Sequence, residues 1–205
     1  HSCRCDASPE SSKRTHMKRV ALVLAAGSGS RFGSDKLSAP FRGEPLVHHA
    51  IRAALKAPAE RAIVVAHPAL DLSAFNNIEI VRLTSTALSD SLREGLDAAG
   101  YVDALFVFLG DMPLVPHDIA AQLVEQIGSA YAAMPRHGDK LGHPVLLSHA
   151  AFADLRLLEG DAGLGKLLRT SKDVVHVDCP SPHIHTDVDK LETLITLERE
   201  TQTLR

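Results

Sequence analysis

The chain has 205 residues, of which 45% are hydrophobic, and its formal net charge is -3. This length suits one domain with a sizeable core, and the mild acidity argues against a broad basic face for nucleic acids. No apolar run approaches the ~20 residues of a membrane-spanning helix, so we expect neither a nucleic acid nor a membrane as a partner. Three cysteines are too few for a disulfide scaffold and suit the reducing cytoplasm, where we expect the protein.

The first sixteen residues differ from the rest of the chain. They are polar and contain no apolar segment of the kind that a secretory signal requires. The pair His16-Met17 looks like a cloning junction. We therefore expect residues 1–16 to be a disordered leader or an expression remnant, and residues 17–205 to form a single domain.

From Met17 onward, apolar runs alternate with segments that have helical spacing. Apolar positions share one helical face near Leu46–Leu55, Leu92–Ala99 and Ile119–Ile127. Strands that alternate with helices predict an α/β fold, in which a mostly parallel sheet has helices on both faces as a three-layer αβα sandwich. The predicted strands are Val20–Leu24, Ala62–Ala66, Ile78–Val81, Ala104–Leu109, Tyr131–Met134 and Val174–Val177.

The first predicted strand runs directly into a glycine-rich loop that ends at Lys36. Glycines let backbone N–H groups wrap an anion, and Arg31 and Lys36 add two cations to the same loop. The spacing of Gly27, Gly29 and Gly33 matches neither the Walker phosphate loop nor the dinucleotide-binding fingerprint. The two cations make a triphosphate site the favoured interpretation, and a plain turn is the alternative.

The predicted strand Ala104–Leu109 is followed at once by Gly110-Asp111-Met112-Pro113. Ligands of such sheets bind at the carboxyl ends of the strands, so Asp111 and the glycine loop should face one crevice. A carboxylate in that place is a hard oxygen ligand for Mg²⁺. The alternative is an aspartate that caps the helix expected near Pro116.

Two of these motifs together resemble one enzyme class, the nucleotidyltransferases. Its metal-binding turn is similar to Gly110-Asp111-Met112-Pro113. Its signature loop is similar to Leu24-Ala25-Ala26-Gly27 followed by Arg31, Gly33 and Lys36. Within the class the chain is most similar to the molybdenum-cofactor nucleotidyltransferases, and the Ala-Ala-Gly form resembles their cytidylyl branch. The resemblance covers Val20 to about Leu197 and implies a Rossmann-like nucleotidyltransferase fold.

The resemblance implies a nucleotide site in which Arg31, Lys36 and Asp111 are the catalytic residues. In related cytidylyltransferases a serine matches Ser91, and its loop contacts the base. The cofactor branch often has an asparagine earlier in that loop, where this chain has Thr84 and Ser85. The expected nucleotide-binding residues are Leu24, Ala25, Ala26, Gly27, Gly29, Ser30, Arg31, Lys36, Thr84 and Ser91.

Local signals predict where the adjoining helices start. Ser89 is a suitable N-cap residue, with Asp90 placed favourably in the first turn that follows. Asp161 is expected to cap a later helix over Leu164–Leu168.

Two motifs resemble the acceptor side of the family's crevice. Gly142-His143-Pro144 follows a predicted hairpin turn at Gly138-Asp139 and matches a Gly-His-Pro element. The segment around Asp161 matches another element, although the family often has an arginine a few residues later, where this chain has Gly165 and Lys166. The residues expected to bind the acceptor are Gly142, His143 and Asp161.

The last motif, Asp187-Val188-Asp189, resembles the family's closing Asp-x-Asp. By this resemblance Asp187 joins Asp111 as the second ligand of Mg²⁺, and Asp189 is left as a cap for a final helix over Leu191–Leu204. A transition-metal site formed by the neighbouring His183 and His185 is the less favoured alternative, because Mg²⁺ and phosphates are hard partners.

The implied reaction transfers CMP from CTP to the phosphate of molybdenum-loaded molybdopterin and releases pyrophosphate. The expected partners are CTP or GTP, a molybdopterin-type phosphate acceptor and a recipient molybdoenzyme. Three alternatives remain: a guanylyltransferase of the same cofactor, a sugar-phosphate nucleotidyltransferase, and a non-catalytic nucleotide-binding protein that delivers the cofactor.

Overall fold

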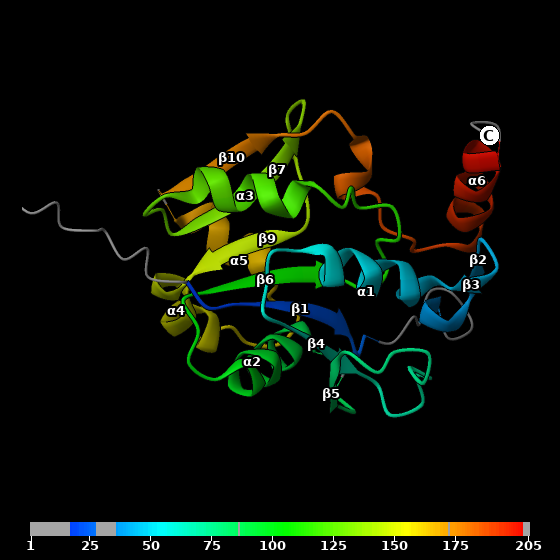
Figure 1. The fold of residues 1–205 in the computed structure, drawn as a ribbon, viewed down its shortest axis with the longest axis horizontal. Helices are drawn as coiled ribbons and strands as arrows, with labels where there is room; N and C mark the ends of the chain where they lie inside the picture. Colours follow the sequence, from blue (N-terminus) through cyan, green and yellow to red (C-terminus); the bar gives the residue numbers. More distant parts are fainter. Residues whose placement is uncertain (1–16, 28–35, 86, 172, 203–205) are drawn as a thin grey trace, which may run out of the picture.

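The centre of the protein is a sheet whose strands run mostly parallel (Figure 1). This computed structural model describes residues 17–27, 36–85, 87–171 and 173–202. The strand order is β10-β7-β9-β6-β1-β4-β5, and β8 pairs with β7 beside this path. The bounds are β1 (Arg19–Ala25), β4 (Arg61–Ala66), β5 (Glu79–Arg82), β6 (Ala104–Leu109), β7 (Ala132–His137), β8 (Lys140–Leu141), β9 (Val145–Ser148) and β10 (Val174–Asp178).

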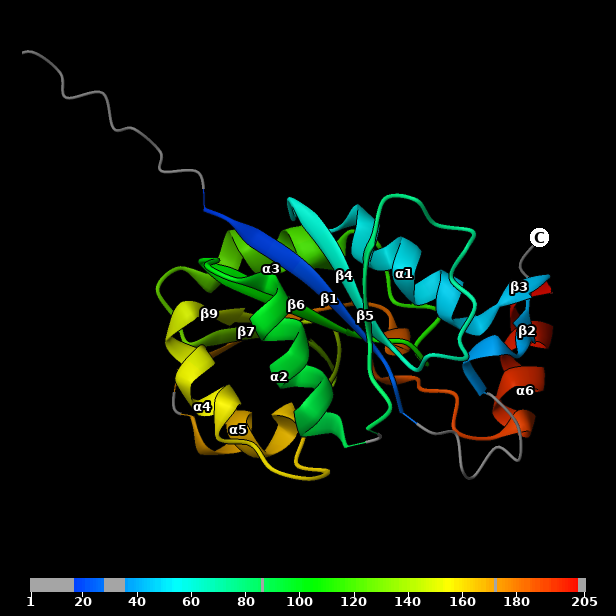
Figure 2. The same cartoon turned by 90° about the horizontal axis from the view of Figure 1, so that it is seen from below.

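Helices cover both faces of the sheet, which confirms the predicted three-layer α/β sandwich (Figures 1 and 2). One face is covered by α1 (Leu46–Lys56) and α3 (Ile119–Ile127). The other face is covered by α2 (Leu88–Ala99), α4 (Phe152–Arg156) and α5 (Leu164–Thr170). Short 3-10 helices span Lys36–Ser38, His149–Ala151 and Pro182–His185. No helix among the described residues is long and apolar enough to cross a membrane.

A smaller unit lies at the end of the sheet where α1 begins. The two-stranded ribbon of β2 (Pro40–Phe41) and β3 (Glu44–Pro45) lies beside the last helix, α6 (Leu191–Gln202) (Figure 1). Their shared apolar cluster consists of Phe41, Leu46, Val188, Leu194 and Leu197. This cluster holds the segment before α6 against the end of the sheet.

The topology reverses between β1 and β6. The chain runs from β1 to β4 and β5 on one side, and then crosses to β6 on the other side of β1. At such a switch point the loops after the two neighbouring strands diverge and leave a crevice at their carboxyl ends. The backbone N–H of Gly110 donates to the carbonyl of Leu24 at 2.9 Å, which ties these two strand ends together.

All six predicted strands are present, and the Gly138-Asp139 turn does join β7 to β8. Gly138 has a φ of +57°, a conformation that glycine adopts without a steric penalty. The sequence did not predict β9, which lies antiparallel between β6 and β7. A cis peptide bond between His143 and Pro144 precedes it.

Two predicted helix caps are wrong. The N-cap residue of α2 is Ala87, and the side chain of Ser89 is buried inside the first turn. The backbone N–H of Ser89 donates to the carbonyl of Gly160 at 3.1 Å, so a loop distant in sequence satisfies this helix end in place of a side chain. The N-cap residue of α5 is Gly163, and Asp161 lies exposed in the preceding turn.

Candidate functional site

A cavity of about 230 Å³ lies at the carboxyl ends of β1 and β6. Five of the residues predicted for the nucleotide site line it, and they come from the β1 end, the following 3-10 helix, the first turn of α2 and the β6 end. Leu37, Leu88 and Leu109 complete the wall with apolar side chains. The five predicted residues are Leu24, Gly27, Lys36, Ser91 and Asp111.

Three carboxylates gather at the edge of this cavity. One oxygen of each of Asp111, Asp187 and Asp189 lies within 4.8 Å of the others. The backbone N–H of Val188 donates to the carbonyl of Asp111 at 3.0 Å, which brings the two segments together. The Val188 side chain is fully buried between the ribbon and α6, while its two acidic neighbours are exposed. Asp189, which the sequence left as a helix cap, therefore belongs to the acidic cluster.

Lys36 lies against this acidic cluster. Its Nζ donates to Asp111 Oδ2 at 2.8 Å and to Asp189 Oδ1 at 3.0 Å. Burial alone would lower the pKa of the Lys36 ammonium, but the charges and hydrogen bonds of the two carboxylates outweigh it and raise that pKa. Lys36 is therefore a permanent cation that neutralises part of the cluster.

The surroundings of Asp187 disfavour its charged form, whereas those of Lys36 favour the charged ammonium. Partial desolvation raises the pKa of Asp187 above the usual 3.8, and the negative charges of Asp189 and Asp111 raise it further. A group of negative charges that repel one another favours a bound cation. Three carboxylates with converging oxygens are hard ligands of the kind that Mg²⁺ and Mn²⁺ prefer, so these residues fit a divalent metal ion.

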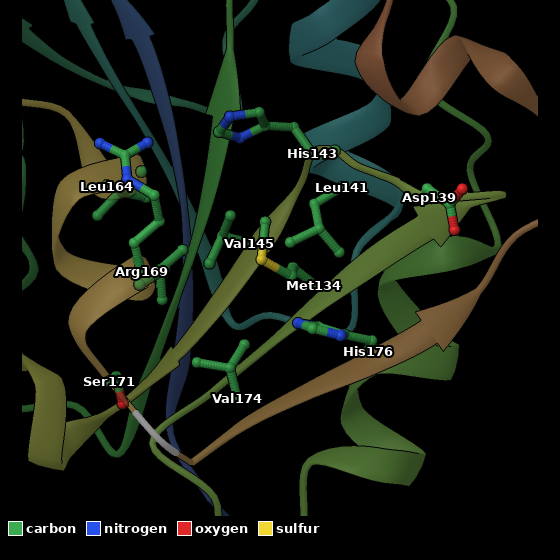
Figure 3. A pocket seen from close by; sticks show the side chains of 13 residues that line it. Met134, Asp139, Leu141, His143, Val145, Leu164, Arg169, Ser171, Val174 and His176 are labelled. Carbon is green, nitrogen blue, oxygen red and sulfur yellow. The ribbon is translucent and has the colours of Figure 1, made fainter.

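A second, larger cavity of about 640 Å³ lies between α5 and the strands β7, β9 and β10 (Figure 3). Gly142 and His143, both predicted to bind the acceptor, line it. The Nδ1 of His143 lies 3.3 Å from the carbonyl oxygen of Val107 on β6. Burial lowers the pKa of His143 below 6.5, although this contact and the charge of Asp111 oppose the shift. The ring is therefore neutral near pH 7.

Backbone packing fixes the position of Gly142 and His143. A Cβ at residue 142 would stand 2.0 Å from the carbonyl oxygen of Ile184, so only glycine fits there. The next N–H, that of His143, donates to the same oxygen at 2.6 Å. Ile184 lies three residues before Asp187, so this contact joins the second cavity to the acidic segment.

The remaining predicted residues lie apart from these two cavities or outside the described part of the chain. Ala25 and Ala26 are buried at the end of β1 and line neither cavity, and the exposed Thr84 and Asp161 line neither. Gly29, Ser30 and Arg31 lie outside the described residues. Their functions stay predictions.

Sequence reasoning also missed Arg169, which lines the second cavity from α5. Residues four positions apart lie on the same face of a helix, so Arg169 shares a face with Gly165. A search for an arginine one turn after Gly165 would have found it. Asp189 had a signal as well, because alternate residues of an extended segment face the same side.

The fold and the acidic crevice together define the class of protein. A doubly wound sheet, with a small cavity, a lysine and three carboxylates at its switch point, has the features of a nucleotidyltransferase. Residues 21–176 match the family model described as a MobA-like NTP transferase domain. The chain therefore belongs to the MobA-like nucleotidyltransferases and is an enzyme of that class.

Individual relatives agree with this family. The chain is 27% identical over 166 residues, 74% of its length, to a probable molybdenum cofactor guanylyltransferase of Thermococcus sibiricus, and covers 81% of that protein. A homologue of Rv0371c from Mycobacterium sp. strain JC1 superposes with a TM-score of 0.82 and 25% identity, over 91% of this chain and 98% of that one. Rv0371c of Mycobacterium tuberculosis H37Rv in complex with manganese superposes with a TM-score of 0.76 and 22% identity, over 89% of this chain and 98% of that one. These likenesses establish the nucleotidyltransferase fold.

Proposed function

We propose that this enzyme transfers the CMP group of CTP to the phosphate of molybdenum-loaded molybdopterin and releases pyrophosphate. The observation that carries the proposal is the convergence of Lys36 with Asp111, Asp187 and Asp189. They lie beside the cavity that Leu24 and Gly27 of the signature loop line. The match of the loop to the cytidylyl form supports CTP. The named relatives support a molybdenum-cofactor acceptor.

In this reaction an oxygen of the acceptor phosphate forms a bond to the α-phosphorus. The bond from that phosphorus to the oxygen bridging to the β-phosphate breaks, and pyrophosphate leaves with its electron pair. A phosphate monoester is already ionised near pH 7, so the enzyme needs no general base. The work of the protein is positioning and charge stabilisation.

The described residues divide this work between them. Asp111 and Asp187, with Asp189 beside them, would hold a divalent cation, in our proposal Mg²⁺. The cation would neutralise phosphate charge and bring the acceptor and the α-phosphate together. Lys36 exchanges its carboxylate partners for the α-phosphate when the nucleotide binds. Ser91 and the apolar wall hold the base, and the cation of Arg31 is predicted to stabilise the leaving pyrophosphate.

Guanylyl transfer is the second candidate, because several relatives are named as probable molybdenum cofactor guanylyltransferases. We would measure pyrophosphate release with Mg²⁺, molybdenum-loaded molybdopterin, and CTP or GTP in separate reactions. Release with CTP alone supports the proposal. Release with GTP alone keeps the chemistry and changes the base. No release with either points to a sugar-phosphate acceptor or a non-catalytic nucleotide-binding protein.

The variant Asp111→Ala tests the acidic centre directly. We expect turnover to fall at least about 10³-fold, because this carboxylate contacts both the cation site and Lys36. The fold should persist, since the side chain lies at a partly exposed strand end, and circular dichroism would check this. Turnover near that of the unaltered enzyme would contradict the metal assignment. Glu94→Gln, a charge removed from the exposed side of α2, is the matched control.

A further inference from the structure

The larger cavity has an apolar floor and a polar rim (Figure 3). Side chains of the sheet and of α5 form the floor, and polar side chains surround it. This combination suits a flat ring system with polar edges, and the volume of about 640 Å³ lies within the ordinary range for ligand sites. The floor consists of Met134, Leu141, Val145, Leu164, Leu168 and Val174, and the rim includes Asp139, His143, Arg169 and His176.

Among the described residues that line this cavity, Arg169 is the one with a permanent positive charge. Its Nη1 lies 3.4 Å from the position that a Cβ of Gly165 would occupy, so the missing side chain of Gly165 leaves room for the guanidinium. The side chain of Arg169 forms no hydrogen bond or ion pair with another residue in the described part of the chain. Its donors are therefore available to a ligand.

The cavity is connected to the reaction centre through His143. This ring lines the cavity, and its Nδ1 lies 3.3 Å from the carbonyl oxygen of Val107 on β6, the strand that ends just before Asp111. The backbone N–H of His143 donates to the carbonyl of Ile184, three residues before Asp187, at 2.6 Å. His143 thus lies between the acidic cluster and the apolar floor. A molecule whose phosphate reaches Asp111 past His143 would place the rest of its body on that floor.

The charges on the rim give such a molecule one orientation. Figure 3 shows Asp139 and Arg169 on opposite sides of the cavity. An anionic group is repelled at Asp139 and attracted at Arg169. Lys166, the next cation along α5, is exposed and does not line the cavity. Within α5, Arg169 is therefore the cation that lines the cavity and meets such a group.

We propose that this cavity is the subsite for the ring body of the acceptor, and that Arg169 binds an anionic or carbonyl group remote from the reacting phosphate. This inference rests on the proposed function, because it takes the acceptor to be a phosphorylated heterocycle. It makes Arg169 a residue that determines acceptor affinity, with no part in nucleotide binding.

The test compares Arg169→Ala with Lys166→Ala, which removes an equal charge from the same helix outside the cavity. We expect Arg169→Ala to raise KM for molybdenum-loaded molybdopterin about 10- to 100-fold, the range for a lost charge-assisted contact. KM for the triphosphate and the saturated rate should change less than about threefold. Arg169→Lys should fall in between, because lysine keeps the charge and loses the forked geometry. Lys166→Ala should match the unaltered enzyme.

Equilibrium dialysis of molybdopterin, without any triphosphate, gives a second measurement that does not depend on turnover. We expect weaker binding by Arg169→Ala and by the cavity-filling variant Val174→Phe. If the unaltered enzyme releases no pyrophosphate with any triphosphate, the proposed function fails, and the dialysis alone decides the subsite. The assignment of Arg169 would be overturned if Arg169→Ala left the acceptor KM unchanged or raised the triphosphate KM. Equal binding of molybdopterin by all variants in the dialysis would overturn it as well.

Discussion

At the scale of single residues, the candidate site is a balance of charge between one lysine and three carboxylates. Lys36 contacts Asp111 and Asp189, so Asp187 is the carboxylate without a direct contact to that ammonium. Its pKa is raised by desolvation and by its two acidic neighbours. The protein without a bound cation therefore holds a charge that its own structure disfavours.

This arrangement predicts how Asp187→Asn changes stability. A carboxyl whose folded pKa exceeds its unfolded value of 3.8 binds its proton more tightly in the folded state. The free energy of unfolding therefore falls as the pH rises through the raised pKa. Below pH 3.8 the carboxyl is protonated in both states, and the unaltered protein and Asp187→Asn should be equally stable. We expect metal-free Asp187→Asn to be more stable than the unaltered protein at pH 7, by at most about 1 kcal/mol because the group is exposed and screened.

Thermal unfolding with a chelator at pH 7 and at pH 3 would measure this effect. One kcal/mol corresponds to a rise in Tm of about 2–4 °C for a chain of this size. The gain should disappear at pH 3, and added Mn²⁺ should stabilise the unaltered protein more than the variant. Glu94→Gln controls for the loss of one negative charge elsewhere. A lower Tm for Asp187→Asn at pH 7 would refute the repulsion argument.

The residue types of the site could be predicted from the sequence, but most of their contacts could not. A glycine loop and an aspartate at two strand ends had to share a crevice, because topology brings such ends together. The contact between Lys36 and Asp189 joins residues 153 positions apart in the chain, and no local pattern reports it. The availability of Arg169 likewise follows from an absent side chain at Gly165.

At the scale of elements, the longer predicted strands β1, β4, β6 and β7 are apolar runs that are largely buried, whereas the predicted edge strands β5 and β10 are more exposed. The strand β9 is shorter, begins directly after Pro144 and pairs antiparallel with both neighbours, so its sequence reads as a loop motif. The helix caps at Ser89 and Asp161 failed for a similar reason. Tertiary contacts, such as that of the Ser89 N–H with Gly160, replaced the local ones.

The close contact of Gly142 with the 3-10 helix Pro182–His185 gives a prediction at this scale. In Gly142→Ala the new methyl group would meet the carbonyl oxygen of Ile184 at 2.0 Å, and the two segments must separate. We expect a loss of about 1–3 kcal/mol in the free energy of unfolding. Because Asp187 follows three residues later, turnover should fall about 10²-fold, as for a displacement near 1 Å.

Denaturant unfolding and pyrophosphate release, both measured where the variant is fully folded, would separate the two effects. Gly128→Ala is the matched control. It forces alanine into a φ of +53° at the end of α3, away from the site, with no atom within 4 Å of the added carbon. The control should lose about 1 kcal/mol of stability and keep its turnover. Equal turnover in both variants would show that the contact with Ile184 does not position the carboxylates.

At the scale of the whole molecule, the site exists only when distant parts of the chain have folded together. Lys36 follows the first strand, Asp111 follows β6, and the two remaining carboxylates precede α6. Val188, between these two carboxylates, is anchored in the cluster that the ribbon and α6 form. The last helix therefore supports the reaction centre although it lies outside the sheet.

A site assembled in this way predicts that ligands stabilise the whole fold. A ligand that binds only the folded state at 100 times its Kd adds about 2.7 kcal/mol. For this chain length that is a rise in Tm of about 5–10 °C. We expect it with CTP and Mg²⁺ or Mn²⁺ together, and a smaller rise when the metal is chelated. Without ligands, Asp111→Asn should unfold at a Tm close to that of the unaltered protein. With CTP and the metal, it should lose most of the rise in Tm. Because no acceptor is needed, CTP and GTP can be compared directly, and a larger shift with CTP would support the proposed base. An equal shift in Asp111→Asn, or one that the chelator leaves unchanged, would mean that the nucleotide binds away from the acidic cluster.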